Sequence, residues 1–152
     1  MEDPSLSPSY HDIFLHACTN GMMHLLLQLI DLCGGIYSYK LYKVMTADCF
    51  TALSHACLSG HIEIVAFIME YYDLNGLTVK ALSSDDHSAF KLACSNEHVA
   101  VVKLLVTYYE CFRDELSDAL QAEDQIVLLY ARDRDFRGYL LSLYAKCGIR
   151  AF

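Results

Sequence analysis

Histidine and cysteine stand two residues apart twice in the sequence, at His16 and Cys18 and again at His55 and Cys57. Imidazole and thiolate groups are preferred zinc ligands, so the pattern raises the question of a metal or redox site. On a helix, residues two apart point about 200° away from each other, and neither pair can then share one ion. We therefore expect no metal and no cofactor, and interpret these cysteines as small residues buried between helices.

Patterns typical of enzymes are not present in the sequence. It contains no Gly-rich phosphate loop, no G-x-S-x-G turn and no H-E-x-x-H pair. His61 and His98 are candidate general bases, but both stand at the start of a second helix in a repeated register, where an imidazole bonds local backbone groups. We interpret both as structural and expect the protein not to be an enzyme.

The elements that carry these residues follow from a pattern that occurs three times. Residues 51–65 match residues 88–102 position by position at an offset of 37, and residues 12–26 precede them at an offset of 39. Ala-Cys recurs in register in all three copies. A repeat of this length cannot bury its apolar face alone, so the copies must stack on one another as a solenoid.

Each copy predicts a short helix, a tight turn and a second helix. Asp12, Thr51 and Ser88 carry side-chain oxygens that can cap the start of the first helix. Gly21 and Gly60 end it, because glycine adopts a left-handed conformation at little steric cost. Apolar residues of the second helices follow at i, i+1, i+4 and i+5, which is one helical face. The sequence therefore predicts an all-α protein.

At these residues the chain resembles the ankyrin repeat family. The motifs that carry the resemblance are Thr51-x-Leu53-x-x-Ala56, Gly60-His61-x-Glu63-Ile64-Val65 and His98-x-x-Val101-Val102-Lys103-Leu104-Leu105. The resemblance implies an ankyrin-like α-solenoid of three helix-turn-helix repeats with long inter-repeat loops and a C-terminal capping helix pair. The alternative is a HEAT-type helical array, whose period suits 37 to 39 residues better than the roughly 33 of ankyrin repeats.

Several positions depart from the ankyrin pattern. The glycine of the family's β-hairpin is replaced by Cys49 and Asp86, and the glycine that ends the second helix by Tyr72 and Tyr109, which disfavours the usual hairpin fingers. Glu97 stands where two copies have glycine, and a left-handed non-glycine residue costs on the order of 1 kcal/mol. The sequence thus predicts that Glu97→Gly raises the melting temperature.

We expect a single domain over residues 1–152. Its repeats are placed at 10–36, 48–75 and 85–111, with an extra helix at 112–121 and a cap at 124–147, whose charged residues suit an outer side that meets water. The insert at 31–47, rich in Tyr and Lys, is expected to be irregular and a candidate contact loop.

Composition restricts the function further. The 152 residues are 55% apolar with a formal net charge of −8, which disfavours binding to nucleic acid. No apolar run approaches the roughly 18 residues of a membrane span, and the N-terminus has no secretory pattern. Seven scattered cysteines are an odd number, which favours reduced thiols. We expect a monomer in the cytoplasm with no membrane partner.

The resemblance implies binding of a partner protein through the concave side of the first helices and the loop tips. Carried over by register, the candidate contact residues are Phe50, Leu58, Ser59, His87, Ser95, Asn96, Thr19 and Asn20. Phe50 and Leu58 are the strongest candidates as apolar anchors, the alternative being that both pack under neighbouring loops. We expect alanine at either position to weaken partner capture without unfolding the chain.

Two other functions stay open at this point. The repeats could be a targeting or regulatory segment of an enzyme, in cis or as a bound inhibitor, or a thiol sensor acting through Cys33 and Cys49. Stretched repeats of this form are similar to those in effectors of intracellular bacteria and in large DNA viruses. That similarity implies a host protein as partner and the host cytosol as compartment.

Overall fold

The computed structural model describes residues 9–151, without the side chains of residues 49, 123 and 124, and this part of the chain is helical with no strand. The elements are α1 (Tyr10–Asn20), α2 (Met23–Leu32), α3 (Tyr39–Ser59), α4 (Ile62–Leu74), α5 (Thr78–Ser95), α6 (Val99–Tyr109), α7 (Arg113–Leu129) and α8 (Arg134–Lys146). The predicted all-α repeat solenoid is confirmed.

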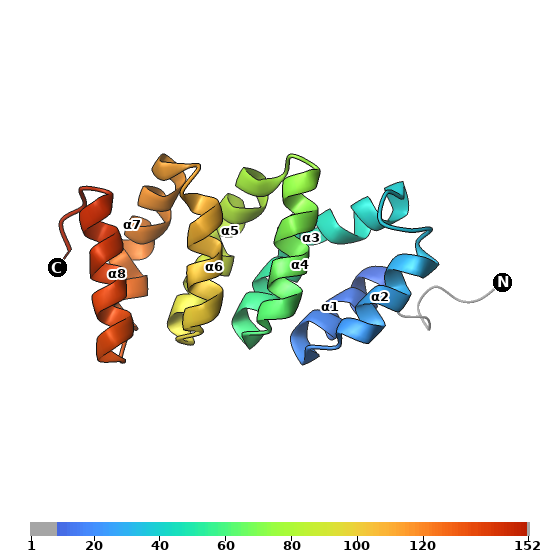
Figure 1. The fold of residues 1–152 in the computed structure, drawn as a ribbon, viewed down its shortest axis with the longest axis horizontal. Coiled ribbons are helices and arrows are strands. Elements are labelled where there is room, and N and C mark those ends of the chain that lie inside the picture. The colour runs from blue at the N-terminus through green and yellow to red at the C-terminus, as the bar shows by residue number, and fades with distance from the viewer. Residues whose placement is uncertain (1–8, 152) are drawn as a thin grey trace.

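The helices form two rows that run the length of the molecule (Figure 1). The odd-numbered helices contact one another in chain order, and each packs against the even-numbered helix that follows it. Helices α1 and α8 lie at opposite ends of the array. Every repeat therefore touches chiefly its immediate neighbours, as a solenoid requires.

Small residues allow the close approach of these rows. The three Ala-Cys pairs are fully buried, and Phe14 and Phe90 pack beside them with no exposed surface. His16 is exposed while Cys18 is buried, so the two side chains lie on different faces of α1. Burial raises the pKa of the Cys18 thiol to about 12 and raises that of Cys57 and Cys94 as well. These thiols are neutral packing groups.

The cap predicted at Asp12 is wrong by three residues. The Ser9 hydroxyl accepts a hydrogen bond from the Asp12 backbone N–H at 3.1 Å, and the Asp12 carboxylate accepts one from the Ser9 N–H at 3.2 Å. Ser9 is thus the N-cap of α1, and Asp12 is the other member of a capping box.

The caps predicted at Thr51 and Ser88 are also wrong. Each of these residues directly follows a left-handed residue, Phe50 or His87, within a span that starts earlier, since α3 begins at Tyr39 behind an N-cap at Ser38 and α5 begins at Thr78. The Thr51 hydroxyl donates to the backbone carbonyl of Asp48, so it does not accept from a free N–H. The long connections expected to be loops, including most of the Tyr/Lys insert, are therefore helical.

Left-handed residues divide each of these long helices into two parts. In α5, Ser84 is extended and residues 85–87 have φ between 52° and 60°. In α3 the positive φ values fall at Asp48 and Phe50, and in α7 at Gln125. We call the part before each left-handed turn the finger helix: residues 39–47, 78–83 and 113–124. The expected extra helix at 112–121 is the third finger, and α8 with the end of α7 occupies the segment expected as the cap.

Tyrosines at the ends of the second helices hold the finger helices in place. The hydroxyl of Tyr72 donates to the Met45 carbonyl at 2.5 Å, that of Tyr109 to the Leu82 carbonyl at 3.2 Å, and that of Tyr144 to the Leu120 carbonyl at 2.5 Å. All three tyrosines are buried. The two departures from the ankyrin pattern therefore belong together. The tyrosine that replaces the glycine at the end of the second helix bonds the finger helix that replaces the β-hairpin.

Gly21 and Gly60 end the first helices in the left-handed region, at φ 69° and 75°, as predicted. His61 and His98 begin the second helices, but their rings do not bond local backbone. Nε2 of His61 donates to the Thr19 carbonyl at 3.0 Å, and Nε2 of His98 donates to the Leu58 carbonyl at 2.9 Å, in each case in the preceding repeat. Each histidine therefore joins two repeats.

Candidate functional site

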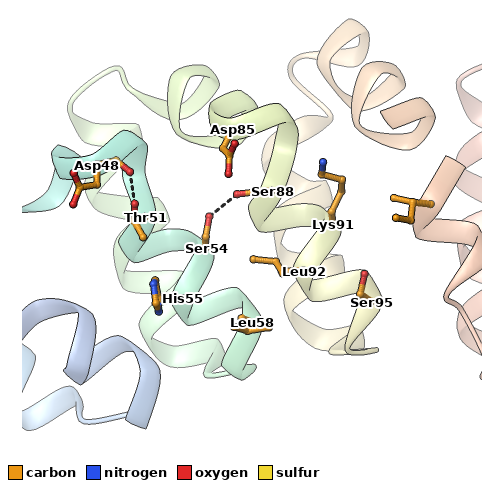
Figure 2. Close-up of a pocket in the computed structure, with 11 residues that line it drawn as sticks. Asp48, Thr51, Ser54, His55, Leu58, Asp85, Ser88, Lys91, Leu92 and Ser95 are labelled. Carbon is orange, nitrogen blue, oxygen red and sulfur yellow. Dashed lines mark hydrogen bonds between the residues drawn. The ribbon is translucent and has the colours of Figure 1, made fainter. Parts of the chain in front are cut away.

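A groove of about 680 Å³ crosses the outward faces of the first helices. Figure 2 shows it spanning α3 and α5 and reaching α7. It is lined by residues from three successive repeats: Asp48, Thr51, Ser54, His55 and Leu58 of α3, Asp85, Ser88, Lys91, Leu92 and Ser95 of α5, and Ile126 of α7.

The lining follows from helical register. Thr51, Ser54, His55 and Leu58 stand at i, i+3, i+4 and i+7, so they share one face of α3. The lining residues of α5 occupy the same positions 37 residues later. Because α3 and α5 pack side by side, the two stripes join into one surface.

The groove has an acidic end and an apolar end. Asp48 and Asp85 lie beside the left-handed turns, and in Figure 2 both stand at the upper side of the groove. The Asp48 side chain is 77% exposed and lies 3.1 Å from His11 Nε2. Leu58, 40% exposed, lies at the lower side near Ser95. The groove therefore offers charged contacts at its upper side and an apolar contact at its lower side.

One basic side chain, that of Lys91, enters the groove between these ends. Its Nζ lies 3.4 Å from Oδ2 of Asp86, an exposed residue that is not part of the lining. This carboxylate offsets the charge of Lys91. The carboxylates of Asp48 and Asp85 then give the upper end a net negative charge.

The polar groups of the groove do not form a nucleophile and base. The hydroxyls of Ser54 and Ser88 bond each other at 2.7 Å, and Nδ1 of His55 lies 3.2 Å from the Thr19 hydroxyl. In the part of the chain that the structure describes, no three metal-ligating side chains converge. The hydroxyls and the imidazole of the groove can donate hydrogen bonds to polar groups of a partner or accept them.

The predicted contact residues fall into three groups. Leu58 and Ser95 line the groove. Thr19, Asn20 and Asn96 are exposed at the ends of α1 and α5, and Ser59 is half-buried at the end of α3. The side chains of Asn20 and Asn96 donate to backbone carbonyls of their own helices, at 2.9 and 2.8 Å. These four residues border the turns next to the groove and are not part of its lining.

Phe50 lies away from the groove. Its ring packs edge-on against Tyr72, with centroids 5.1 Å apart and planes at 88°, and it is half-buried against the core. At Phe50 the structure therefore shows the alternative to a partner contact, which is a side chain packed against the protein itself. The expectation that Phe50→Ala leaves the fold intact is revised, because the substitution removes an aromatic contact with a buried residue.

His87 is also not a surface contact residue. It is buried, its Nδ1 lies 2.8 Å from the Tyr109 hydroxyl, and its Nε2 lies 3.6 Å from the Glu115 carboxylate. Burial lowers the pKa of His87, while the carboxylates of Glu115, Asp86 and Asp118 act in the opposite direction. The side chain connects the third repeat to the third finger helix.

Sequence reasoning missed most of the acidic end and the centre of the groove. Asp48, His55, Asp85, Lys91 and Leu92 were not candidates. The available signal was the stripe that runs from Thr51 to Leu58 and recurs 37 residues later. Interpreting Thr51 and Ser88 as caps hides this stripe, because a cap lies at the end of a helix and not on its outward face.

The cysteines offer little support for thiol sensing. Cys33 is buried and burial raises its pKa, with Lys40 opposing the shift. Cys111 is exposed, and the Cys49 side chain lies outside the described residues. None of the helices in residues 9–151 is long and apolar enough to cross a bilayer.

Paired helices stacked in two rows, with one groove across the first-helix row, define a repeat solenoid built to present a surface. Residues 13–116 match the family described as "Ankyrin repeats (3 copies)". The match spans more than half of the chain, which therefore belongs to the ankyrin repeat family. No curated protein and no solved structure matches the chain in the corresponding comparisons. Ankyrin repeats are generally modules of protein–protein interaction and are typically non-catalytic.

Proposed function

We propose that this chain is a non-catalytic module that binds a partner protein through the groove across α3, α5 and α7. The observation that carries the proposal is the groove itself, which has a volume of about 680 Å³ and is lined by residues of three successive repeats. Leu58, Leu92 and Ile126 supply apolar contact area, and hydroxyls and carboxylates between them supply directional contacts. Such a mixture is typical of protein interfaces.

Leucine substitutions inside and outside the groove test this proposal. Leu58→Ala removes an apolar contact in the groove, and Leu74→Ala removes one at an exposed position on α4, where the side chain is 75% exposed. Partner affinity should fall about tenfold for the first, the loss typical of an apolar anchor, and stay unchanged for the second. Circular dichroism should show the same helical signal for both. Equal affinity of both variants would contradict the groove as the binding surface.

The finer parts of the proposal concern the partner and compartment. We propose a monomer that binds protein and no nucleic acid in the cytoplasm, with a host protein as partner if the resemblance to effectors and viral proteins holds. The formal charge of −8 supports the first part, as do the cysteines of the described side chains, which are free and mostly buried. A role as the targeting or regulatory segment of an enzyme would use the same groove. Mass spectrometry of proteins retained by the wild-type chain but not by Leu58→Ala distinguishes these partners.

A further inference from the structure

We propose that the groove recognises a basic segment of its partner, in which two Arg or Lys side chains pair with Asp48 and Asp85 and a neighbouring apolar side chain packs on Leu58 and Leu92. This inference rests on the proposed function and names the chemistry of the partner.

Charge complementarity carries the first step. Asp48 and Asp85 are exposed and both line the groove. Among the described residues, Asp85 has no ion-pair partner, while Lys91 lies beside Asp86. Asp48 contacts His11 Nε2 at 3.1 Å. Within the described part of the chain, a cation that docks between the two lining carboxylates therefore meets one carboxylate that contacts an imidazole and one that has no ion-pair partner. An acidic partner segment, or a phosphate backbone, would be repelled there and by the charge of the whole chain.

Repetition sets the spacing of the two carboxylates. Asp48 and Asp85 stand 37 residues apart at equivalent register positions, each beside a left-handed turn. The first helices that carry them pack side by side, and packed helices lie about 8–10 Å apart. In a polyproline II segment, which has three residues per turn, residues three apart share one face and are separated by about 9 Å. Basic residues at i and i+3 fit this spacing.

The apolar end gives the segment a direction. Leu58, which is 40% exposed, and the half-buried Leu92 lie below the carboxylates in Figure 2. A segment of basic residues alone would leave this apolar area uncovered. The groove therefore fits a mixed sequence with charge toward the finger helices and an apolar side chain toward the Leu58 end.

The conformation at the two aspartates makes a clean test available. Both have positive φ, 51° at Asp48 and 52° at Asp85, and asparagine tolerates this region as well as aspartate does. The double variant Asp48→Asn, Asp85→Asn thus removes two charges and keeps shape and backbone. Asp31→Asn with Glu70→Gln is the matched control, since it removes two exposed charges on α2 and α4.

The probe is a display library of short random peptides selected on the full chain, and one selected peptide is then titrated by fluorescence polarisation. We expect peptides with paired basic residues next to an apolar one. Their affinity should fall about tenfold in the Asp48→Asn, Asp85→Asn variant, stay unchanged in the control variant, and weaken as salt is raised.

Other results overturn the inference in distinguishable ways. Neutral or acidic peptides, no enriched peptide, or equal affinity for the double variant and the control contradict the basic segment. If Leu58→Ala still lowers the affinity for the selected peptides, the groove remains the binding surface and only the basic segment is contradicted. If Leu58→Ala leaves the affinity unchanged, the proposed function and this inference both fail. A dimer in sedimentation that the double variant dissociates would assign the groove to a second copy of the chain.

Discussion

At Glu97, the contact that joins two neighbouring repeats differs from the contact at the two earlier junctions. In the two earlier junctions a histidine ring lies against a glycine, and an added Cβ would approach the ring to 2.7 Å at Gly21 and 2.5 Å at Gly60. In the repeat that follows Glu97 the second helix is α8, and it begins at an N-cap on Asp133 where α4 and α6 begin at a histidine. The Glu97 carboxylate instead accepts hydrogen bonds from the Arg132 and Asp133 N–H groups, at 2.5 and 2.7 Å. Glycine is therefore not required there.

These contacts reverse the stability change predicted for Glu97→Gly from the sequence. Glu97 has φ 53°, so glycine would relieve about 1 kcal/mol of backbone strain. It would also remove two hydrogen bonds that are exposed to solvent, each worth about 1 kcal/mol. We expect a net loss of about 1 kcal/mol and a melting temperature lower by about 2–4 °C. Glu97→Gln, which keeps an acceptor oxygen at the same φ, should lose less, and a stabilised Glu97→Gly would contradict this account.

His87 gives the fold a predictable response to acid. Its pKa lies below the ordinary 6.5 in the folded chain because burial disfavours the charged ring, despite the nearby carboxylates of Glu115, Asp86 and Asp118. The unfolded chain then binds the proton more readily, so the contribution of His87 to stability is lost as pH falls below about 6.5. His87→Asn, which suits the positive φ and does not titrate, should lose less stability than wild type between neutral and mildly acidic pH. Urea unfolding at both values measures the difference, and equal losses would exclude His87 as the source.

The sequence could predict most of the fold at the level of elements. The paired helices, their apolar faces and the glycine turns follow from local periodicity, because each signal lies within a few residues. The finger helices could not be predicted in this way. The turns after them use left-handed Asp48 and Asp85 instead of glycine, and their anchors, Tyr72 and Tyr109, are 27 residues away from the carbonyls they bond. Contacts at that separation leave no local periodic signal.

Tyrosine substitutions measure how much the finger helices depend on these anchors. Tyr72→Phe leaves the buried Met45 carbonyl without a donor, which should cost about 1–3 kcal/mol. Tyr109→Phe should cost more, since its hydroxyl contacts both the Leu82 carbonyl and Nδ1 of His87. Chemical denaturation provides both values. Tyr37→Phe, at a position 97% exposed, is the control and should be neutral; a similar loss there would mean that the hydroxyls do not act through the fingers.

The groove was predictable in part for a related reason. Register singles out Leu58 and Ser95, which line the groove, because they lie close to the recognisable glycine turn and its equivalent. Asp48 and Asp85 sit next to the finger helices, so their position depends on elements that the sequence pattern did not reveal. The position of the apolar end of the groove thus depends on the glycine turn of the repeat, and the position of its acidic end depends on the finger helices.

At the scale of the whole molecule, stability depends on junctions between repeats, since a solenoid has few contacts beyond nearest neighbours. The junction between the second and third repeats contains Gly60 at φ 75°, with the His98 ring against it and Nε2 of His98 bonded to the Leu58 carbonyl. A methyl group at Gly60 must displace this ring. It would therefore disturb the connection between two repeats and also the backbone of Leu58, which lines the groove.

We expect Gly60→Ala to lower the free energy of unfolding by about 2 kcal/mol. About 1 kcal/mol comes from the left-handed alanine and about 1 kcal/mol from the lost hydrogen bond of His98. Gly76→Ala isolates the first contribution, because Gly76 has φ 68° and an added Cβ there meets nothing within 4 Å. In a His98→Ala background the ring is gone, so Gly60→Ala should cost only about as much as Gly76→Ala. Urea denaturation of the four variants in this cycle gives the coupling energy directly. Strictly additive losses at Gly60 and His98 would show that the imidazole moves aside at no cost and that the junction is held by the buried helix faces alone.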